Sequence, residues 1–406
     1  MEKEINLESW DFKNSDTKEY THCVNTYPAM MIPPVARRLI NIYGKDAKNL
    51  IDPFLGSGTS IVEASIVSNI KEVFGFDLNP LAILISKVKT TPLDILKLEK
   101  NLSIILFNKE CSNIPNFKNI EFWFKPNVIK KLAIIKTAIN KIKDENIKNF
   151  FLATFSETVR TVSNTRNGEF KLYRMSKESL EKHNPDVMKE FEKFSLKNIN
   201  GMKEYLLKRT STKINIINTS SMNELPIEPL SVDLLITSPP YGDSRTTVAY
   251  GQFSRLALQW LGYEDVASLD NRLLGGKASK ELEVKVNSST LKEIIKKIAE
   301  KDEKRAREVL SFYEDFDKCV IQLNGVMAKN GFVCFVVGNR TVKGINIPTN
   351  KIMIEMFMSH GNYKFIKTYT RAIPNKRMPK LNCPSNKAGE KVTTMCNEFI
   401  FILQKN

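Results

Sequence analysis

One stretch of the chain, residues 50–60, restricts the possible fold more than any other. Its sequence is Leu-Ile-Asp-Pro-Phe-Leu-Gly-Ser-Gly-Thr-Ser, in which an apolar run leads into a glycine turn and then into the polar start of a new apolar segment. Glycine allows the backbone to turn sharply and to approach a ligand closely. Thr59 or Ser60 can cap a helix that follows. The stretch therefore predicts a strand, a tight turn and a helix, the repeating unit of an α/β fold.

An acidic residue closes the next apolar run. Residues 73–76 (Val-Phe-Gly-Phe) are followed by Asp77. It stands roughly twenty residues after the glycine turn, where Rossmann-type sites place a carboxylate that accepts hydrogen bonds from ribose hydroxyls. The glycines do not follow the dinucleotide pattern, and Thr59 stands where a phosphate-binding loop would carry lysine. A nucleoside without phosphates is therefore a better expected ligand than NAD or ATP.

A third constraint is the segment 237–241, Thr-Ser-Pro-Pro-Tyr, which follows the apolar run 232–236. Each proline lacks an N–H and has a fixed φ, so its carbonyl is held in one direction and is free to accept a hydrogen bond. Ser238 adds a hydroxyl acceptor, and Tyr241 offers a ring on which a planar base can stack. This ledge suits an exocyclic amino group whose hydrogens must be held while its nitrogen attacks. The alternative is that the two prolines only end a strand.

Together these motifs resemble those of the amino-group DNA methyltransferases of restriction-modification systems. The matching segments are 52–59 (Asp-Pro-Phe-x-Gly-x-Gly-Thr), 77–80 (Asp-x-Asn-Pro) and the ledge 237–241. The resemblance implies transfer of a methyl group from S-adenosylmethionine to N4 of cytosine or N6 of adenine. In that family a serine at the first ledge position, here Ser238, is typical of N4-cytosine enzymes, whereas adenine enzymes more often carry Asp or Asn.

The resemblance also assigns roles to individual residues. The catalytic residues, which hold the target base, are expected to be Ser238, Pro239, Pro240 and Tyr241. The cofactor-binding residues are expected to be Tyr27, Asp52, Pro53, Phe54, Gly56, Gly58, Thr59, Asp77, Asn79 and Ser220. Tyr27 comes from a segment that in this family packs near the methionine end of the cofactor. Ser220 or Ser221 occupies a loop that usually carries an aspartate on the adenine side.

The chain is strongly basic. It has 61 Lys and Arg against 45 Asp and Glu, a net charge of +16. Such a balance favours a polyanionic partner, because each neutralised phosphate releases counterions. With a base-holding ledge the expected partner is double-stranded DNA, from which the target cytosine must be flipped out. The candidate DNA contacts, each of which could instead be a solvated loop charge, are Arg166, Arg174, Arg245, Lys376 and Arg377.

The hydrophobic periodicity predicts an α/β fold with a Rossmann-like methyltransferase sheet. The sheet is expected to be mostly parallel, with an antiparallel hairpin from strands at 363–370 and 398–403. We expect residues 1–92 to form the N-terminal part of the catalytic domain. Residues 93–212 should be a large helical insertion that could recognise DNA. Residues 213–406 should complete the catalytic domain and include a charged helical segment at about 263–330.

Several classes of site are not indicated. The six cysteines and three histidines show no metal-ligand spacing, so no metal site is expected. The chain start does not resemble a signal peptide, and no apolar run is long enough to span a bilayer. Reduced thiols in the cytoplasm of a prokaryotic cell are therefore expected.

Other functions remain open from the sequence. One is DNA adenine-N6 methylation with the same fold and cofactor, and another is methylation of RNA or of a protein glutamine. A different class is a non-catalytic nucleic-acid-binding protein on a methyltransferase scaffold. A cognate restriction endonuclease is an expectation by analogy alone.

Overall fold

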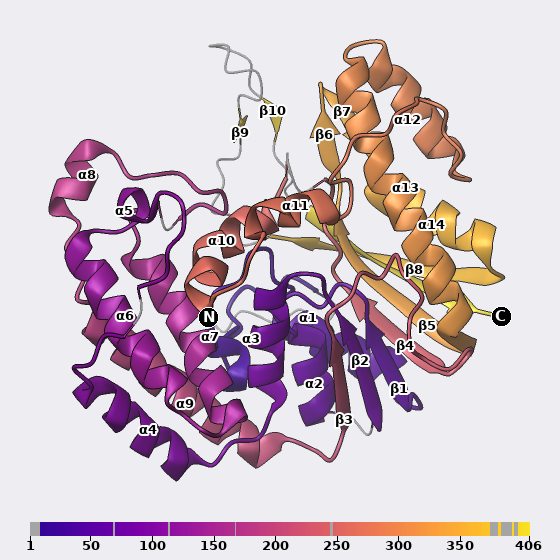
Figure 1. Cartoon of the computed structure of the whole chain (residues 1–406). Helices are drawn as coiled ribbons and strands as arrows, with labels where there is room; N and C mark the ends of the chain where they lie inside the picture. The colour runs from indigo at the N-terminus through magenta and orange to yellow at the C-terminus, as the bar shows by residue number, and fades with distance from the viewer. Residues whose placement is uncertain are drawn as a thin grey trace, which may run out of the picture.

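The computed structural model describes residues 9–67, 70–112, 114–166, 168–243, 247–373, 381–382, 392–393 and 397–406. Its centre is a seven-stranded sheet (Figure 1). The strands of this sheet are β1 (Asn49–Asp52), β2 (Glu72–Phe76), β3 (Lys213–Ile217), β4 (Val232–Thr237), β5 (Met327–Gly338), β8 (Tyr363–Ala372) and β11 (Asn397–Lys405). They lie in the order β3-β2-β1-β4-β5-β11-β8.

The direction of the strands confirms the predicted fold class. Strands β3, β2, β1, β4 and β5 pair in parallel, and β11 pairs antiparallel with both β5 and β8. The chain winds outward in both directions from the adjacent pair β1 and β4, so the strand order reverses there. Because parallel strands end at the same edge of a sheet, Asp52, Asp77 and Thr237 come together at this switch point.

Helices cover both faces of the sheet, as the alternation of side chains along its strands requires. On one face, α1 (Pro33–Tyr43), α2 (Thr59–Val67) and α3 (Pro80–Thr90) share a core cluster that includes Cys334 and Val336 of β5. On the other face, α13 (Glu303–Val326) and α14 (Thr349–His360) pack against Val333, Phe335 and Val337 of the same strand. Both faces of the central strand β5 are therefore buried.

A helical segment lies between α3 and β3, where an insertion is predicted (Figure 1). Its helices are α4 (Ile95–Phe107), α5 (Ile120–Trp123), α6 (Pro126–Asn140), α7 (Glu145–Val162), α8 (Lys177–Lys182) and α9 (Val187–Lys208). All of these helices except α8 contribute apolar side chains to one core cluster, which also contains Leu84 and Val88 of α3 and Trp260 of α10 (Tyr250–Leu261). The rings of Phe124 and Phe155 meet Trp260 edge-on, at centroid distances of 5.7 and 6.0 Å. The insertion is thus packed directly onto helices that border the sheet's carboxyl edge.

The segment 263–330 is helical only in part. It contains η2 (Val266–Ser268), α11 (Leu269–Arg272), α12 (Ser289–Ala299) and α13, with no helix between α11 and α12. The side chains of Ser288 and Asp302 cap α12 and α13 separately, each by accepting a hydrogen bond from a backbone N–H in the first turn. The predicted charged helical segment is thus interrupted between α11 and α12, and its last residues, from Met327 on, belong to β5.

The remaining elements are short. They are η1 (Tyr20–Cys23), the hairpin β6 (Arg340–Val342) with β7 (Ile345–Ile347), and the pair β9 (Leu381–Asn382) with β10 (Val392–Thr393). Within the described ranges, every helix is too short or too polar for a membrane span.

Candidate functional site

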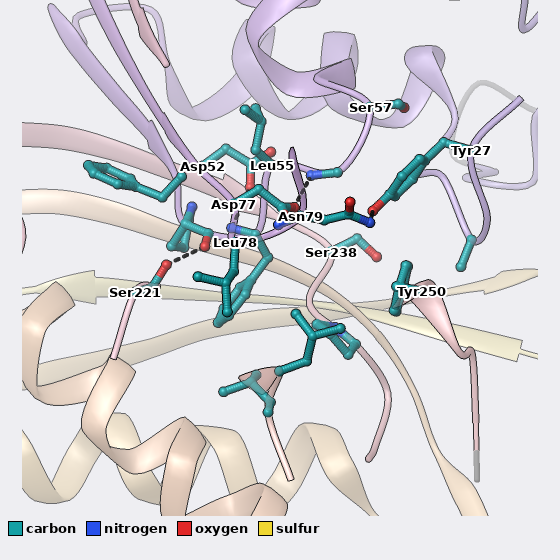
Figure 2. Close-up of a pocket in the computed structure, with 18 of the residues that line it drawn as sticks. Tyr27, Asp52, Leu55, Ser57, Asp77, Leu78, Asn79, Ser221, Ser238 and Tyr250 are labelled. Carbon is teal, nitrogen blue, oxygen red and sulfur yellow. Dashed lines mark hydrogen bonds between the residues drawn. The ribbon is translucent and has the colours of Figure 1, made fainter. Parts of the chain in front are cut away.

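A pocket opens at the carboxyl ends of β1, β2 and β4 (Figure 2). Its unfilled space is about 870 Å³, a figure that includes open solvent at the mouth. Segments from both halves of the chain line it, namely residues 27–31, 52–57, 59, 76–79, 219–221, 238, 240, 250 and 272–274. The two halves of the fold thus meet at one concave site.

Asp77 lies on the β2 side of the pocket. Its Oδ2 accepts a hydrogen bond from Gly56 N and its Oδ1 from Asn79 N, both at 2.8 Å. The glycine turn can present this N–H because Gly56 adopts a positive φ of 51°. Burial raises the pKa of Asp77 to about 6, against the opposing effect of the backbone donors, and the charge of Asp52 raises it further. The carboxylate suits a ligand that brings hydroxyl donors or positive charge.

Asp52 joins the two strands at the switch point. Its Oδ1 accepts from Thr237 Oγ1 at 2.6 Å and from Phe54 N at 3.1 Å, while its Oδ2 accepts from Ser60 Oγ. Burial raises the pKa of Asp52 to about 6, although all three donors oppose this shift. Because Asp52 ends β1 and Thr237 ends β4, this contact sets the position of the ledge relative to the glycine turn.

Asn79 connects the pocket to the N-terminal segment. Its Oδ1 caps α3 by accepting from Leu81 N at 3.1 Å, and its Nδ2 donates to Tyr27 OH at 2.9 Å and to Ser254 Oγ at 2.7 Å. Tyr27 is buried and stacks on Tyr250 with ring centroids 6.0 Å apart. Figure 2 shows both tyrosines beside Asn79. A single buried amide therefore orients an aromatic wall of the pocket.

The ledge contributes Ser238 and Pro240 to the pocket lining, whereas Pro239 and Tyr241 are not among the lining residues that the structure describes. The Tyr241 ring is half-buried against the core, and its hydroxyl donates to Glu398 Oε1 at 2.8 Å. Ser238 Oγ lies 3.2 Å from the same Tyr241 hydroxyl. The serine thus faces the pocket with the tyrosine hydroxyl behind it.

Most residues predicted for the site are brought together here. Those that line the pocket are Tyr27, Asp52, Pro53, Phe54, Gly56, Thr59, Asp77, Asn79, Ser220, Ser238 and Pro240. Gly58 lies under α3, where a Cβ would stand 2.9 Å from Ser86 Oγ at a φ of +78°. The absence of a side chain at Gly58 therefore allows α3 to approach closely. Gly58 is not among the residues that line the pocket.

Sequence reasoning missed two parts of the lining. Tyr250 begins α10, the first helix after the ledge, and its aromatic character next to that motif was a usable signal. Arg272, Leu273 and Leu274 reach the pocket from the end of α11. Their segment carries no motif, so only the tertiary structure reveals them. Arg272 is the one cationic side chain among the described lining residues.

The predicted DNA contacts are only partly described. Arg166 is exposed, with its Nη1 3.5 Å from Glu169 Oε1, and the guanidinium of exposed Arg174 lies 4.2 Å from the Phe122 ring centroid. Both lie on a loop that leans on α10, because Leu172 N donates to Gln252 Oε1 at 3.4 Å. The other predicted contacts, Arg245, Lys376 and Arg377, lie outside the described residues.

In the part of the chain that the structure describes, no group of three or more His, Cys, Asp or Glu side chains is placed to hold a metal ion.

Comparison with known proteins adds an independent line of support. The family model described as "D12 class N6 adenine-specific DNA methyltransferase" matches residues 35–307. The chain is 45% identical over 424 residues to the Type II methyltransferase M.MvaI of Kocuria varians, covering 97% of this chain and 93% of that protein. It is 29% identical over 118 residues to the Type II methyltransferase M.MjaII of Methanocaldococcus jannaschii, covering 28% and 22% of the two chains.

One solved structure with a similar outline is the rRNA methyltransferase aviRa of Streptomyces viridochromogenes. It matches with a TM-score of 0.32 and 9% identity, covering 94% of this chain and 89% of that one.

The contact between Thr237 and Asp52 can be tested by substitution. Thr237→Val keeps the shape of the side chain but removes a donor from a buried carboxylate, so we expect a loss of about 1–3 kcal/mol in the free energy of unfolding. Thr237→Ser keeps the hydroxyl and should lose clearly less. Urea denaturation followed by tryptophan fluorescence measures both. A smaller loss in Thr237→Val than in Thr237→Ser would show that the methyl group, not the hydrogen bond, matters at this position.

Proposed function

We propose that this chain, which belongs to the Type II DNA methyltransferases of the D12 class, methylates N4 of a cytosine flipped out of duplex DNA. It is an enzyme of the restriction-modification type that uses S-adenosylmethionine and acts on DNA. The choice of the N4 position is the proposal, and the serine at the first ledge position, Ser238, carries it. This serine lines the same pocket as Asp77, so an amine held by one would lie near a ligand held by the other.

The pocket fits S-adenosylmethionine by its chemistry. When bound, the cofactor would supply a methyl group carried on a sulfonium. As the N4 lone pair forms the new N–C bond, the electrons of the S–C bond would stay on sulfur, and one N4 proton would pass to water. Asp77 accepts from the ribose hydroxyls, and the glycine turn holds the methionine part with the segment around Tyr27. Leu78 and Leu274 offer apolar surfaces to the adenine ring. The described lining has two carboxylates, Asp52 and Asp77, against one arginine, Arg272, and it has no lysine, so its charge suits a cationic nucleoside without phosphates.

The ledge residues hold the amino group of the base. Ser238 Oγ accepts from one hydrogen of N4, and the Pro239 carbonyl is the proposed acceptor for the other. Holding both hydrogens favours a tetrahedral nitrogen with a directed lone pair, so positioning and oriented acceptors account for most of the rate enhancement. Tyr250 offers a ring from the pocket wall on which the base can stack, whereas Tyr241, the ring predicted for this role, packs against the core and is not among the described lining residues.

Adenine N6 is the second candidate, and one observation favours it. The matching family is described as N6 adenine-specific. Ser238 argues for cytosine, because adenine enzymes with this ledge more often carry Asp or Asn at the same position. The two bases present the same kind of exocyclic amine, so the pocket chemistry described above serves either.

Positive charge supports DNA binding outside the pocket. The net charge of +16 favours a polyanion, and the loop with Arg166 and Arg174 rests on α10, whose first residue lines the pocket. We propose that these two arginines contact phosphates beside the flipped base and that the segment 93–212 takes part in recognition. Arg245, Lys376 and Arg377 remain proposed contacts. We further propose a cytoplasmic enzyme of a prokaryotic cell, with a cognate endonuclease.

The base specificity can be decided by one measurement. DNA methylated by the purified enzyme is digested to nucleosides and analysed by mass spectrometry. We expect N4-methylcytosine. Detection of N6-methyladenine in its place would contradict the proposal and assign the adenine function. A catalytically impaired Ser238→Ala variant is the control, and we expect it to give neither product while it still binds the cofactor.

The raised pKa of Asp77 predicts how cofactor affinity depends on pH. The folded protein holds this carboxyl with a pKa of about 6, so it is ionised at pH 7 and protonated near pH 5. Only the ionised form can accept from both ribose hydroxyls, so the Kd for S-adenosylmethionine should rise as the pH falls through 6. The Kd can rise by at most about tenfold per pH unit for each proton that Asp77 takes up. Isothermal titration calorimetry between pH 7 and pH 5 measures this change.

Asp77→Asn is the matched control for the pH series. It should bind more weakly at pH 7 and show a flatter dependence on pH. If the variant kept the full pH dependence of the natural protein, the titrating group would be Asp52, whose pKa is also about 6.

A further inference from the structure

A line of hydrogen bonds leads from the pocket wall to the C-terminal hairpin. Ser238 Oγ lies 3.2 Å from Tyr241 OH, and Tyr241 OH lies 2.8 Å from Glu398 Oε1. Glu398 Oε2 accepts from Arg371 Nη1, and Arg371 Nε donates to Trp10 O at 3.1 Å. Of these residues only Ser238 lines the pocket, so the others can act on the substrate only through it.

The direction of each proton along this line follows from the charges. Glu398 forms an ion pair with Arg371, and an ionised carboxylate can only accept hydrogen bonds. The Tyr241 hydroxyl must therefore donate to Glu398. Burial raises the pKa of Tyr241 well above its ordinary value, and the charge of Glu398 adds to this shift, so the phenol keeps its proton. With its proton committed to Glu398, the Tyr241 oxygen is an acceptor for Ser238.

The consequence concerns the lone pairs of Ser238. A serine hydroxyl has one proton and can turn it toward several partners. When that proton is donated to Tyr241, the oxygen lone pairs remain for other donors. The amino group of a neutral cytosine offers only hydrogens on that side, so a serine proton turned into the pocket would oppose it. The line of hydrogen bonds turns the Ser238 proton toward Tyr241, which leaves the serine lone pairs free to accept from the amino group.

The anchor of this line is held by the sheet. Glu398 of β11 stands directly opposite Arg371 of β8 in the antiparallel register. The two side chains are 14% and 5% exposed, so their ion pair is shielded from solvent. The register of the hairpin thus fixes the carboxylate relative to Tyr241, which packs against the core.

We propose that Glu398 is a positioning residue that, through Tyr241, fixes the Ser238 hydroxyl as an acceptor for the target amine. This inference rests on the proposed function, in which Ser238 holds an exocyclic amino group. It assigns to the C-terminal hairpin a role in the methyl-transfer step, although no hairpin residue among those described lines the pocket.

The test is a double-mutant cycle with Tyr241→Phe and Glu398→Gln. Tyr241→Phe removes the hydroxyl and keeps the ring, so the packing of the ring against the core is preserved. Glu398→Gln can donate to Tyr241 and reverse the direction of the protons. Single-turnover methylation of a cognate duplex should be slowed about tenfold by each variant, the scale of one hydrogen bond. The Kd for S-adenosylmethionine should be unchanged in both.

The double variant separates positioning from a structural effect. If Glu398 acts through Tyr241, the double variant should be as slow as Tyr241→Phe alone, because the removed hydroxyl leaves Glu398 no further influence. A rate reduced by the product of both factors would overturn the proposal, as would a Tyr241→Phe variant with the natural rate. The Tyr241→Phe result stands by itself if Glu398→Gln fails to fold, which thermal unfolding reveals.

Two controls keep this test distinct from that of the proposed function. Asp11→Asn changes a side chain that accepts from Ala372 N at 2.7 Å, next to Arg371, and leaves the line of hydrogen bonds in place. Its methylation rate should stay within about twofold of the natural one. The modified nucleoside is identified in the same reactions. If it is N6-methyladenine, the cytosine proposal fails, while the cycle still tests how Ser238 is oriented toward an amine.

Discussion

The pocket exists because two strands that are far apart in sequence end side by side, and the hydrogen bond between Thr237 and Asp52 fixes how they do so. β1 brings the glycine turn and β4 brings the ledge. A displacement of one strand along the other would separate Ser238 from Asp77. Such a change would remove the site without removing any functional group. A buried carboxylate with three donors is a costly way to join two strands, but its hydrogen bonds are directional in a way that apolar packing is not.

Charge is divided between the inside and the outside of this enzyme. The protein carries a net charge of +16, yet its pocket is built around two carboxylates whose pKa values are raised by burial. In the absence of ligand, each ionised carboxylate in a desolvated place works against folding above its raised pKa. A bound cationic ligand makes the contribution of these ionised carboxylates to stability favourable, because it supplies the missing positive charge. The outer surface meanwhile attracts a polyanion. The same chain can thus attract two ligands of opposite charge at different depths.

How much of this was predictable depends on the range of the interactions. The strand–turn–helix unit, Asp77 and the ledge are local patterns, and parallel strands must bring their ends together, so the fold class and most of the lining followed from the sequence. Tyr241 was predicted as a stacking ring, but its hydroxyl partner Glu398 stands 157 residues away. Such a pairing is set by the register of β11 on β8, which periodicity does not specify. Residues 272–274 were not predicted as part of the lining, because they also reach the pocket through tertiary contacts that periodicity does not specify.

The chemistry of the ledge explains why a serine there needs support from a distant strand. A carboxylate at the first ledge position can only accept, so it faces an amine correctly in any rotamer that reaches it. An amide presents a fixed oxygen that packing can orient. A hydroxyl has both a proton and lone pairs and rotates freely, so it needs a second partner to take its proton. Tyr241 is placed to do so, and the Glu398–Arg371 pair makes Tyr241 an acceptor. A ledge that begins with serine is therefore incomplete as a local motif, and its acceptor function depends on the antiparallel end of the sheet.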